Sequence, residues 1–456
     1  MSINIHDGSS FNEVSNVYAV PSYSTYPRKS ARVWVHNGTK YMMVKGRLLE
    51  VEWESDLSTW GGVSWGGSNN REPYHNKLKS MLVLDNGDLL GVVDYVINNN
   101  STNQYSTNRY SLIKLSSDTG SISAFSNYTS WSSWNAVSGY KQTDQPIGII
   151  RCGDYYVAYS EHGIFYVFNS GGTYKSKYEN ETWHTDGSSK YIYESNDYGI
   201  KCCFQDVNSC IYYSYYDQNK NDTDSSSYMT SIYRVGISGS SLYTPRRHYA
   251  GEREARYYGI CTNVLADGTS KKAVANFSGR TSSYLDKLVV FSTSYSYSST
   301  TTDVSALCSI TDGVDDEGEY PIFIKDGYVY TINGFDGDMV YKRNLTDLSL
   351  IWSAKVPELS GGYRECSNSH QVFPERDGGF MLPNGCTVYP DGKIVKEKQL
   401  FTDNGGTYQN ETIPSFCFNE TLGIGYMMNY SDGDYSSTEY SSTPFCKVIK
   451  LKEVKK

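Results

Sequence analysis

The sequence lacks long apolar runs and an excess of positive charge. Its 456 residues include 41 Lys and Arg against 50 Asp and Glu, a net charge of -9, so no overall positive field favours nucleic acid or an anionic membrane. The apolar runs are far shorter than the roughly 20 residues of a membrane-spanning helix. Residues 1–8 lack the charged and apolar regions of an export signal. We expect a chain made in the cytoplasm without a signal peptide, with no nucleic-acid partner and no membrane insertion.

Motifs for metal ions and cofactors are also missing. There is no Cys-x-x-Cys, and Cys202 and Cys203 are adjacent, which on a strand directs their side chains to opposite faces. The seven His are scattered, and the acidic stretch 312–319 does not keep the spacing of an EF-hand calcium loop. We predict no metal and no cofactor. The ten Cys are too sparse for a disulfide scaffold, and we expect them reduced and mostly packed in strands.

Catalytic motifs are absent in the same way. We find no nucleophile elbow and no phosphate-binding loop. The turns at 116–120 and 195–199 resemble the start of the sialidase blade motif but lack its Thr-Trp end. Glu161, Asp206 and Glu319 are eligible for sugar hydrolysis, yet the sequence singles out no pair of them. We therefore predict that the protein is not an enzyme.

What the sequence has in abundance is Tyr and Gly, with 43 and 40 residues respectively. Aromatic and β-branched residues interleaved with Gly, Asn and Asp indicate short half-buried strands joined by turns. No window keeps the apolar spacing of a helix. The strands fall into seven groups, at 81–125, 146–178, 191–243, 256–307, 320–356, 371–400 and 415–451.

This grouping predicts an all-β fold, a β-propeller with seven four-stranded blades over residues 79–456; six and eight blades are the alternatives. The last group has only three strands. The segment 47–53 would supply the fourth by pairing with the last blade, which would close the ring and remove its exposed edges. Residues 46–78 are then this closing strand followed by a Gly-, Ser- and Trp-rich linker.

Residues 1–45 hold a repeat at an offset of thirty residues. The segments 3–14 and 33–44 each read as strand, Asp-Gly or Asn-Gly turn, strand, because these dipeptides tolerate the positive φ of a tight hairpin turn. A lone hairpin is barely stable in water, so we expect these modules to pack on each other or on a partner subunit.

The repeated units, of the form V-x-V-x-D/N-G-x-x-aromatic-x-E-V, resemble modules common in minor tail and fibre proteins of tailed bacteriophages. The first copy, ending Phe11-Asn-Glu-Val14, fits closely, and the second departs from it at Met42-Met43. The resemblance implies a location in the virion, docking onto other tail or head proteins, and homo-oligomeric copies in the particle. The residues that would dock are Ile3, Ile5, Phe11, Val14, Val33, Val35, Tyr41 and Val44.

Aromatic residues in polar surroundings are candidates for contact with a host-surface glycan or protein. They are Trp60, Trp65, Trp131, Trp134, Tyr213 and Tyr215. Strand aromatics more often pack between blades, and that alternative applies most strongly to the run Tyr212–Tyr216.

Three functions remain open at this point. The first is a phage structural protein of the tail or a fibre that acts by binding, with assembly through its N-terminus and attachment to the host surface through the propeller. The second is a polysaccharide depolymerase or glycosidase of the virion. The third is a purely architectural tail, nozzle or head-decoration component.

Overall fold

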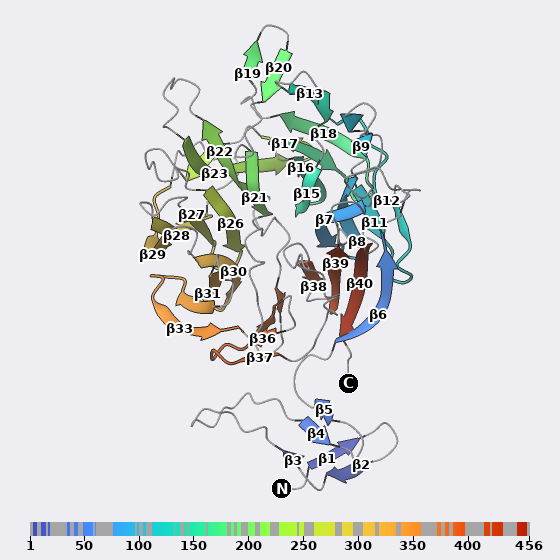
Figure 1. Ribbon diagram of the computed structural model, residues 1–456, viewed down its shortest axis with the longest axis vertical. Coiled ribbons are helices and arrows are strands. Elements are labelled where there is room, and N and C mark those ends of the chain that lie inside the picture. Colours follow the sequence, from blue (N-terminus) through green and yellow to red (C-terminus); the bar gives the residue numbers. More distant parts are fainter. Residues whose placement is uncertain are drawn as a thin grey trace, which may run out of the picture.

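A computed structural model shows a ring of β-sheets with two small hairpin units beneath it (Figure 1). No described residue lies in a helix. The structure describes residues 3–6, 11–14, 17–18, 34–36, 41–43, 49–57, 60, 76–95, 98–99, 104–105, 112–131, 133–136, 141–143, 146–160, 163–179, 184–186, 189–192, 199–205, 210–218, 228–243, 246–249, 260–278, 285–294, 304–314, 319–333, 339–356, 372–374, 379–382, 386–396, 415–419, 422–431 and 445–453.

Seven four-stranded antiparallel sheets form the blades, as predicted. Each begins with an inner strand and ends at the rim. Blade 1 comprises β7 (Asn76–Val83), β8 (Leu89–Tyr95), β11 (Leu112–Leu115) and β12 (Ile122–Ala124), and blade 2 comprises β15 (Pro146–Cys152), β16 (Tyr155–Ser160), β17 (Ile164–Phe168) and β18 (Tyr174–Glu179). Blade 3 comprises β21 (Gly199–Gln205), β22 (Cys210–Gln218), β23 (Tyr228–Ser238) and β24 (Ser241–Leu242), and β25 (Arg246–Tyr249) also pairs with β23. Blade 4 comprises β26 (Ile260–Asp267), β27 (Lys272–Ser278), β28 (Leu285–Ser292) and β29 (Cys308–Val314).

The last three blades follow the same order. Blade 5 comprises β30 (Glu319–Lys325), β31 (Tyr328–Asn333), β32 (Met339–Asn344) and β33 (Leu350–Lys355). Blade 6 comprises β34 (Phe373–Pro374), β35 (Phe380–Met381), β36 (Cys386–Val388) and β37 (Ile394–Lys396). Blade 7 comprises β38 (Ser415–Asn419), β39 (Ile424–Ser431), β40 (Phe445–Glu453) and β6 (Leu49–Asp56).

The predicted closing strand is confirmed. β6 precedes all the blades in the sequence, yet it pairs antiparallel with β40 and forms the outer strand of blade 7. The register runs from Lys447 opposite Asp56 to Glu453 opposite Leu49. Blade 7 therefore joins the first and the last strands of the propeller, and its inner strand β38 contacts β7 of blade 1.

Apolar clusters occupy the interfaces between successive blades. For example, one cluster combines Val157 of blade 2 with Tyr213 of blade 3, and another combines Tyr212 of blade 3 with Phe291 of blade 4. Because side chains alternate along a strand, Tyr212 and Tyr213 reach opposite faces of their blade and both are fully buried. This two-sided burial explains why strands such as β17 are apolar throughout.

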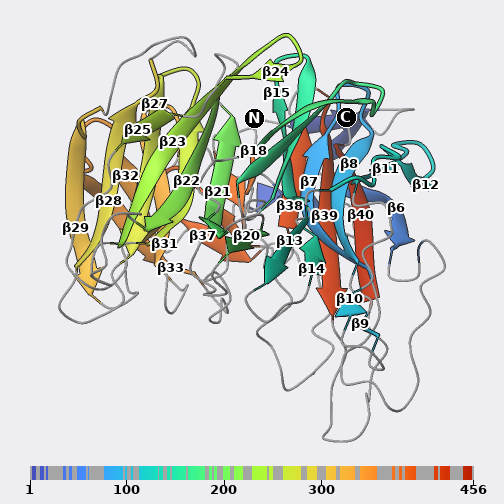
Figure 2. The same ribbon diagram turned by 90° about the horizontal axis from the view of Figure 1, so that it is seen from above.

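Further strands lie outside the blades. They are the hairpin β9 (Asn98–Asn99) and β10 (Gln104–Tyr105); the sheet β14 (Lys141–Thr143), β13 (Ser133–Ala136), β20 (Ser189–Ile192) and β19 (His184–Asp186); and the N-terminal strands β1 (Ile3–His6), β2 (Phe11–Val14), β3 (Val17–Tyr18), β4 (Trp34–His36) and β5 (Tyr41–Met43). Figure 2 shows β9, β10 and β14 on the same side of the blades.

Three segment boundaries differ from the sequence analysis. Tyr191, expected to open the third blade, lies in β20 outside it, and the blade begins at Gly199. The outer strand of the fourth blade begins just after the expected end of that group, at Cys308. β7 begins at Asn76, inside the expected linker, because its polar start, Asn76-Lys77, does not resemble a buried strand.

Six cysteines are free thiols in strands, as expected, and all but Cys308 are buried; they are Cys152, Cys210, Cys308, Cys386, Cys417 and Cys446. Burial and, to a lesser extent, the nearby Cys210 raise the pKa of Cys152 to about 12. Burial raises the pKa of Cys417 further. These thiols are therefore packing residues, not reactive ones.

Candidate functional site

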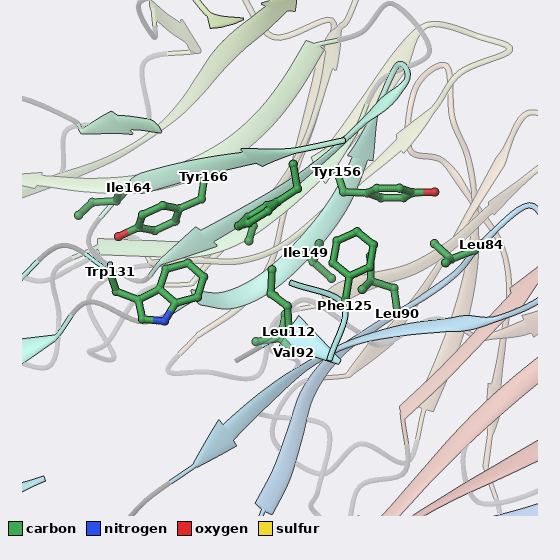
Figure 3. Close-up of a cluster of buried hydrophobic side chains, with 12 residues drawn as sticks. Leu84, Leu90, Val92, Leu112, Phe125, Trp131, Ile149, Tyr156, Ile164 and Tyr166 are labelled. Atoms are coloured by element: carbon green, nitrogen blue, oxygen red, sulfur yellow. The ribbon is translucent and has the colours of Figure 1, made fainter. Parts of the chain in front are cut away.

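The segment 125–131 leaves the outer strand of blade 1 and crosses onto blade 2, where aromatic rings hold it. The Phe125 ring meets the Tyr156 ring edge-on at 5.7 Å between centroids. Tyr128 stacks on Tyr174 at 4.2 Å and 15°. Figure 3 shows this buried cluster where blade 1 meets blade 2. We call this segment the aromatic strap.

Trp131 ends the strap and corrects one prediction. The sequence suggested Trp131 as a contact residue for a host-surface glycan or protein, yet its side chain is only 7% exposed. Its ring packs edge-on against Tyr166 at 4.8 Å between centroids (Figure 3). The neighbouring Thr129 and Ser130 are exposed, so their polarity reflects the outer side of the strap and not the position of the indole. Trp131 therefore acts as an anchor.

The strap leads directly into a small sheet built from two connections between blades, which we call the accessory sheet. β13 follows the strap, and β20 comes from the connection between blades 2 and 3. The two strands pair in parallel, with Asn135 opposite Tyr191, while β14 and β19 flank them. Trp134 lies in this sheet opposite Gln142. The aromatic strap thus places one predicted contact residue on a sheet outside the propeller core.

The remaining predicted contact residues have different positions. Tyr213 is fully buried between blades 2 and 3, as the packing alternative for the run Tyr212–Tyr216 requires. Trp60 is half-buried against the cluster between blades 7 and 1. Tyr215 lies in β22 opposite Ile200, and Trp65 lies outside the described residues.

The N-terminal repeat forms the predicted hairpins. In the first, Ile3 pairs with Val14 and Ile5 with Asn12. Phe11 faces His6 in the same register.

In the second hairpin, Val35 pairs with Met42 and Tyr41 with His36, and β3 adds a third strand alongside β4. Val33 and Val44 lie outside the described residues. Figure 1 shows both hairpin units below the ring, on the side where β6 begins.

Two tryptophans on outer strands hold the next blade in the same way. Trp53 on β6 donates its indole N–H to the carbonyl oxygen of Ser117, 2.9 Å away in the β11–β12 turn of blade 1. Trp352 on β33 donates to the carbonyl oxygen of Pro390, also 2.9 Å away, in the β36–β37 turn of blade 6. We call these contacts the blade 7 clamp and the blade 5 clamp.

A lysine completes each clamp from the adjacent strand. Lys450 on β40 lies opposite Trp53, and Lys342 on β32 lies opposite Trp352. Lys450 Nζ donates to the same carbonyl oxygen as its tryptophan, and Lys342 Nζ does likewise at 3.0 Å. In each clamp a cross-strand pair thus converges on one acceptor.

Glycines allow the two turns to approach the indole rings. Gly120 has φ +69 and Gly392 has φ +89. A Cβ atom at Gly120 would lie 2.9 Å from the Trp53 ring, and one at Gly392 would lie 3.0 Å from the Trp352 ring. Both the backbone conformation and the close contact therefore require glycine.

The charges around the two lysines differ. Lys450 forms an ion pair with Glu52 on β6, and its side chain is 5% exposed. Lys342 lies over the ring of Tyr328, with Nζ 4.0 Å from the centroid. Burial lowers the pKa of Lys342, although Asp326 and Asp391 oppose this effect.

Asp88 supports the acceptor turn of the blade 7 clamp. Its Oδ1 accepts a hydrogen bond from the Ser117 amide at 2.8 Å, and its Oδ2 accepts one from Asn86 Nδ2 at 2.9 Å. Burial disfavours the carboxylate, but these hydrogen bonds and the nearby Lys114 outweigh burial and lower the pKa of Asp88 below its ordinary value of 3.8.

Glu319, one of the eligible carboxylates, has a structural role. It is 4% exposed, accepts a hydrogen bond from Arg343 Nε at 2.8 Å, and also bonds Arg343 Nη2 and the Thr331 hydroxyl. A buried carboxylate engaged in this way is held in place by its partners. Glu161 and Asp206 lie outside the described residues.

The described residues contain no group of three or more His, Cys, Asp or Glu side chains arranged to hold a metal ion. Nor do they form an apolar helix of the length needed to span a bilayer.

No family model and no curated protein sequence matches this chain. Among solved structures, a chain from a crystal structure of the mitotic checkpoint complex is 8% identical, with 88% of this chain and 91% of that chain covered and a TM-score of 0.44. The computationally designed Ika8 protein is 10% identical, with coverage of 88% and 99% and a TM-score of 0.39. BamB from Moraxella catarrhalis is 8% identical, with coverage of 89% and 98% and a TM-score of 0.38. The propeller fold is established by the strand pairing of the chain itself.

Proposed function

We propose that this chain is a structural protein of a tailed-phage particle, in the tail or a fibre, and that it acts by binding. The N-terminal hairpins dock onto other virion proteins. The propeller is a rigid platform, and its accessory sheet contacts a host-surface glycan or protein. Many copies in one particle let weak contacts act together.

The observation that carries the proposal is the pairing of the N-terminal strands. Among the described residues, β1 to β5 pair only with one another. A lone two-stranded hairpin such as β1–β2 is barely stable in water, so a partner surface that covers it adds stability. The resemblance of their sequence to phage tail modules indicates the kind of partner.

A deletion of residues 1–45 tests the docking role. We expect the truncated propeller to fold, as judged by circular dichroism, and to be lost from assembled particles. The substitution Ile5→Asp should weaken incorporation as well. Asn4→Asp adds the same charge on the opposite face of the same strand and should have a smaller effect. Normal incorporation of the truncated chain would overturn the docking role.

Binding and catalysis are separated by a second assay. Purified protein is incubated with host-surface polysaccharide, and both retention and fragment release are measured. We expect retention without fragments. Fragments would instead identify a depolymerase. If the protein retains no polysaccharide, and particles that lack it still adsorb to the host, the protein is an architectural component.

A further inference from the structure

The strand β6 has two roles in this topology. It closes the ring by pairing with β40, and it is the segment through which the N-terminal hairpins join the blades. Figure 1 shows β6 running along the rim, with its start on the side of the hairpins. Any pull between the hairpins and the ring therefore passes through this strand.

β6 is held from both sides. Towards blade 7, its backbone pairs with β40 over its whole length, and Glu54 forms an ion pair with Lys447 at 2.8 Å. Towards blade 1, Trp53 donates to the Ser117 carbonyl at 2.9 Å, and Ser55 Oγ donates to the Gly120 carbonyl at 2.8 Å. The contacts with blade 1 lie in the second half of the strand, away from the hairpins.

The direction of the pull decides how these bonds resist it. Hydrogen bonds between antiparallel strands lie perpendicular to the strands. A force along β6 loads all of them at once, whereas a force at one end that separates β6 from β40 breaks them in succession. Leu49 faces Glu453, so the two chain ends leave this pair at the same end. A pull between the two chain ends should therefore peel the strands apart.

We propose that β6 and the blade 7 clamp form a mechanical junction, which transmits force from the docked hairpins to the propeller by loading β6 along its length. The biological use of this junction rests on the proposed docking of the hairpins. Its mechanics depend only on the contacts of β6.

Single-molecule force measurements on the full chain test the junction in two geometries. One handle is attached at the N-terminus. The second is attached either at the exposed Ser170, in the β17–β18 turn of blade 2, or at the C-terminus. We expect a clearly higher detachment force for β6 with the handle at Ser170. Equal forces in the two geometries would overturn the proposal.

The two clamps supply a matched pair of variants. Trp53→Phe and Trp352→Phe each remove one indole hydrogen bond of 2.9 Å and keep an aromatic ring. Since one hydrogen bond contributes roughly 1 kcal/mol, we expect Trp53→Phe to detach β6 about fivefold faster at a given force. Trp352→Phe should leave that rate unchanged, because the blade 5 clamp lies outside the path of the force. Equal acceleration by both variants would show a general loss of stability and would refute the junction.

Failure of the proposed function is distinguishable from failure of the junction. If particles incorporate the chain without residues 1–45, docking is wrong, but the force measurements still stand. If docking holds and the two pulling geometries give equal forces, the junction alone is wrong.

Discussion

Blades 5 and 7 grip their neighbours with the same atoms but are connected to the chain differently. In both, an outer-strand tryptophan and its cross-strand lysine converge on one carbonyl oxygen of the next blade. In blade 5, β33 follows β32 through a short turn. In blade 7, β6 precedes all the other propeller strands in the sequence, whereas its partner β40 is the last of them. The same pair of hydrogen bonds should therefore have different consequences for the whole molecule, because the chain connectivity differs.

The largest expected effect comes from truncating each tryptophan. Trp53→Ala and Trp352→Ala should each lower the free energy of unfolding by about 3 kcal/mol, because a large, partly buried ring is lost together with its hydrogen bond. Urea denaturation measures this loss. The comparison is sharpened by amide hydrogen exchange: Trp53→Ala should expose β6 and β40 throughout, whereas Trp352→Ala should affect β33 locally. Similar exchange patterns would show that connectivity has no influence.

The acceptor turns give a smaller effect. Gly120→Ala should lower the free energy of unfolding by about 2 kcal/mol and Gly392→Ala by about 1 kcal/mol. Both substitutions place alanine at a positive φ, but only the first also brings the new Cβ close to a second side chain. That side chain is Ser55, whose Oγ would clash with the new Cβ. Gly239→Ala is the control, because its φ is +56 and its Cβ would meet nothing within 4 Å. It reports backbone strain alone.

Replacing the two clamp lysines should lower the free energy of unfolding by different amounts. Lys450→Met removes the ion pair with Glu52 and the hydrogen bond to the Ser117 carbonyl, and we expect the free energy of unfolding to fall by about 1–2 kcal/mol at neutral pH. Lys342→Met should cost less than about 1 kcal/mol, because burial already disfavours the charged form of Lys342. Since its folded pKa lies below the ordinary 10.5, its deprotonation should raise stability as pH approaches 10.5, and the variant should lack this rise. Equal losses at neutral pH would contradict this account.

Acid should weaken the blade 7 clamp through Asp88. Because the folded pKa is lowered, the carboxylate contributes stability above its ordinary value of 3.8, and this contribution is lost as pH falls through the folded pKa. We expect Asp88→Asn to cost about 1 kcal/mol at pH 7 and to remove this part of the acid sensitivity. Urea midpoints of both proteins between pH 7 and pH 2 provide the measurement. An unchanged acid profile in the variant would contradict the role of Asp88.

The sequence predicted the propeller and its closing strand because both depend on local patterns. Strand groups recur at a regular spacing, and the last group lacks one strand, which the segment before the linker supplies. The clamps were missed because they depend on which turn meets which strand between blades. Their sequence signal is the repeated Val-x-Lys at Val448-Ile-Lys450 and Val340-Tyr-Lys342. It is recognisable only when the strand pairing is known.

The candidate site was predictable only in part. The hairpin turns revealed the N-terminal strands, since Asp7-Gly8 and Asn37-Gly38 are local signals. The position of Trp131 could not be predicted, because its polar neighbours in the sequence suggest an exposed residue although the ring is buried. The accessory sheet was also missed, as its parallel pairing joins segments on either side of a whole blade.

Because β6 pairs with β40, the ring can close only after both strands have been synthesised. The ribosome releases residues 49–56 long before residues 445–453. β6 therefore has no β40 partner while the intervening blades form. A nascent chain that stops early never receives its partner, and its exposed edge invites aggregation. Ring closure therefore requires that the chain has been synthesised through residues 445–453.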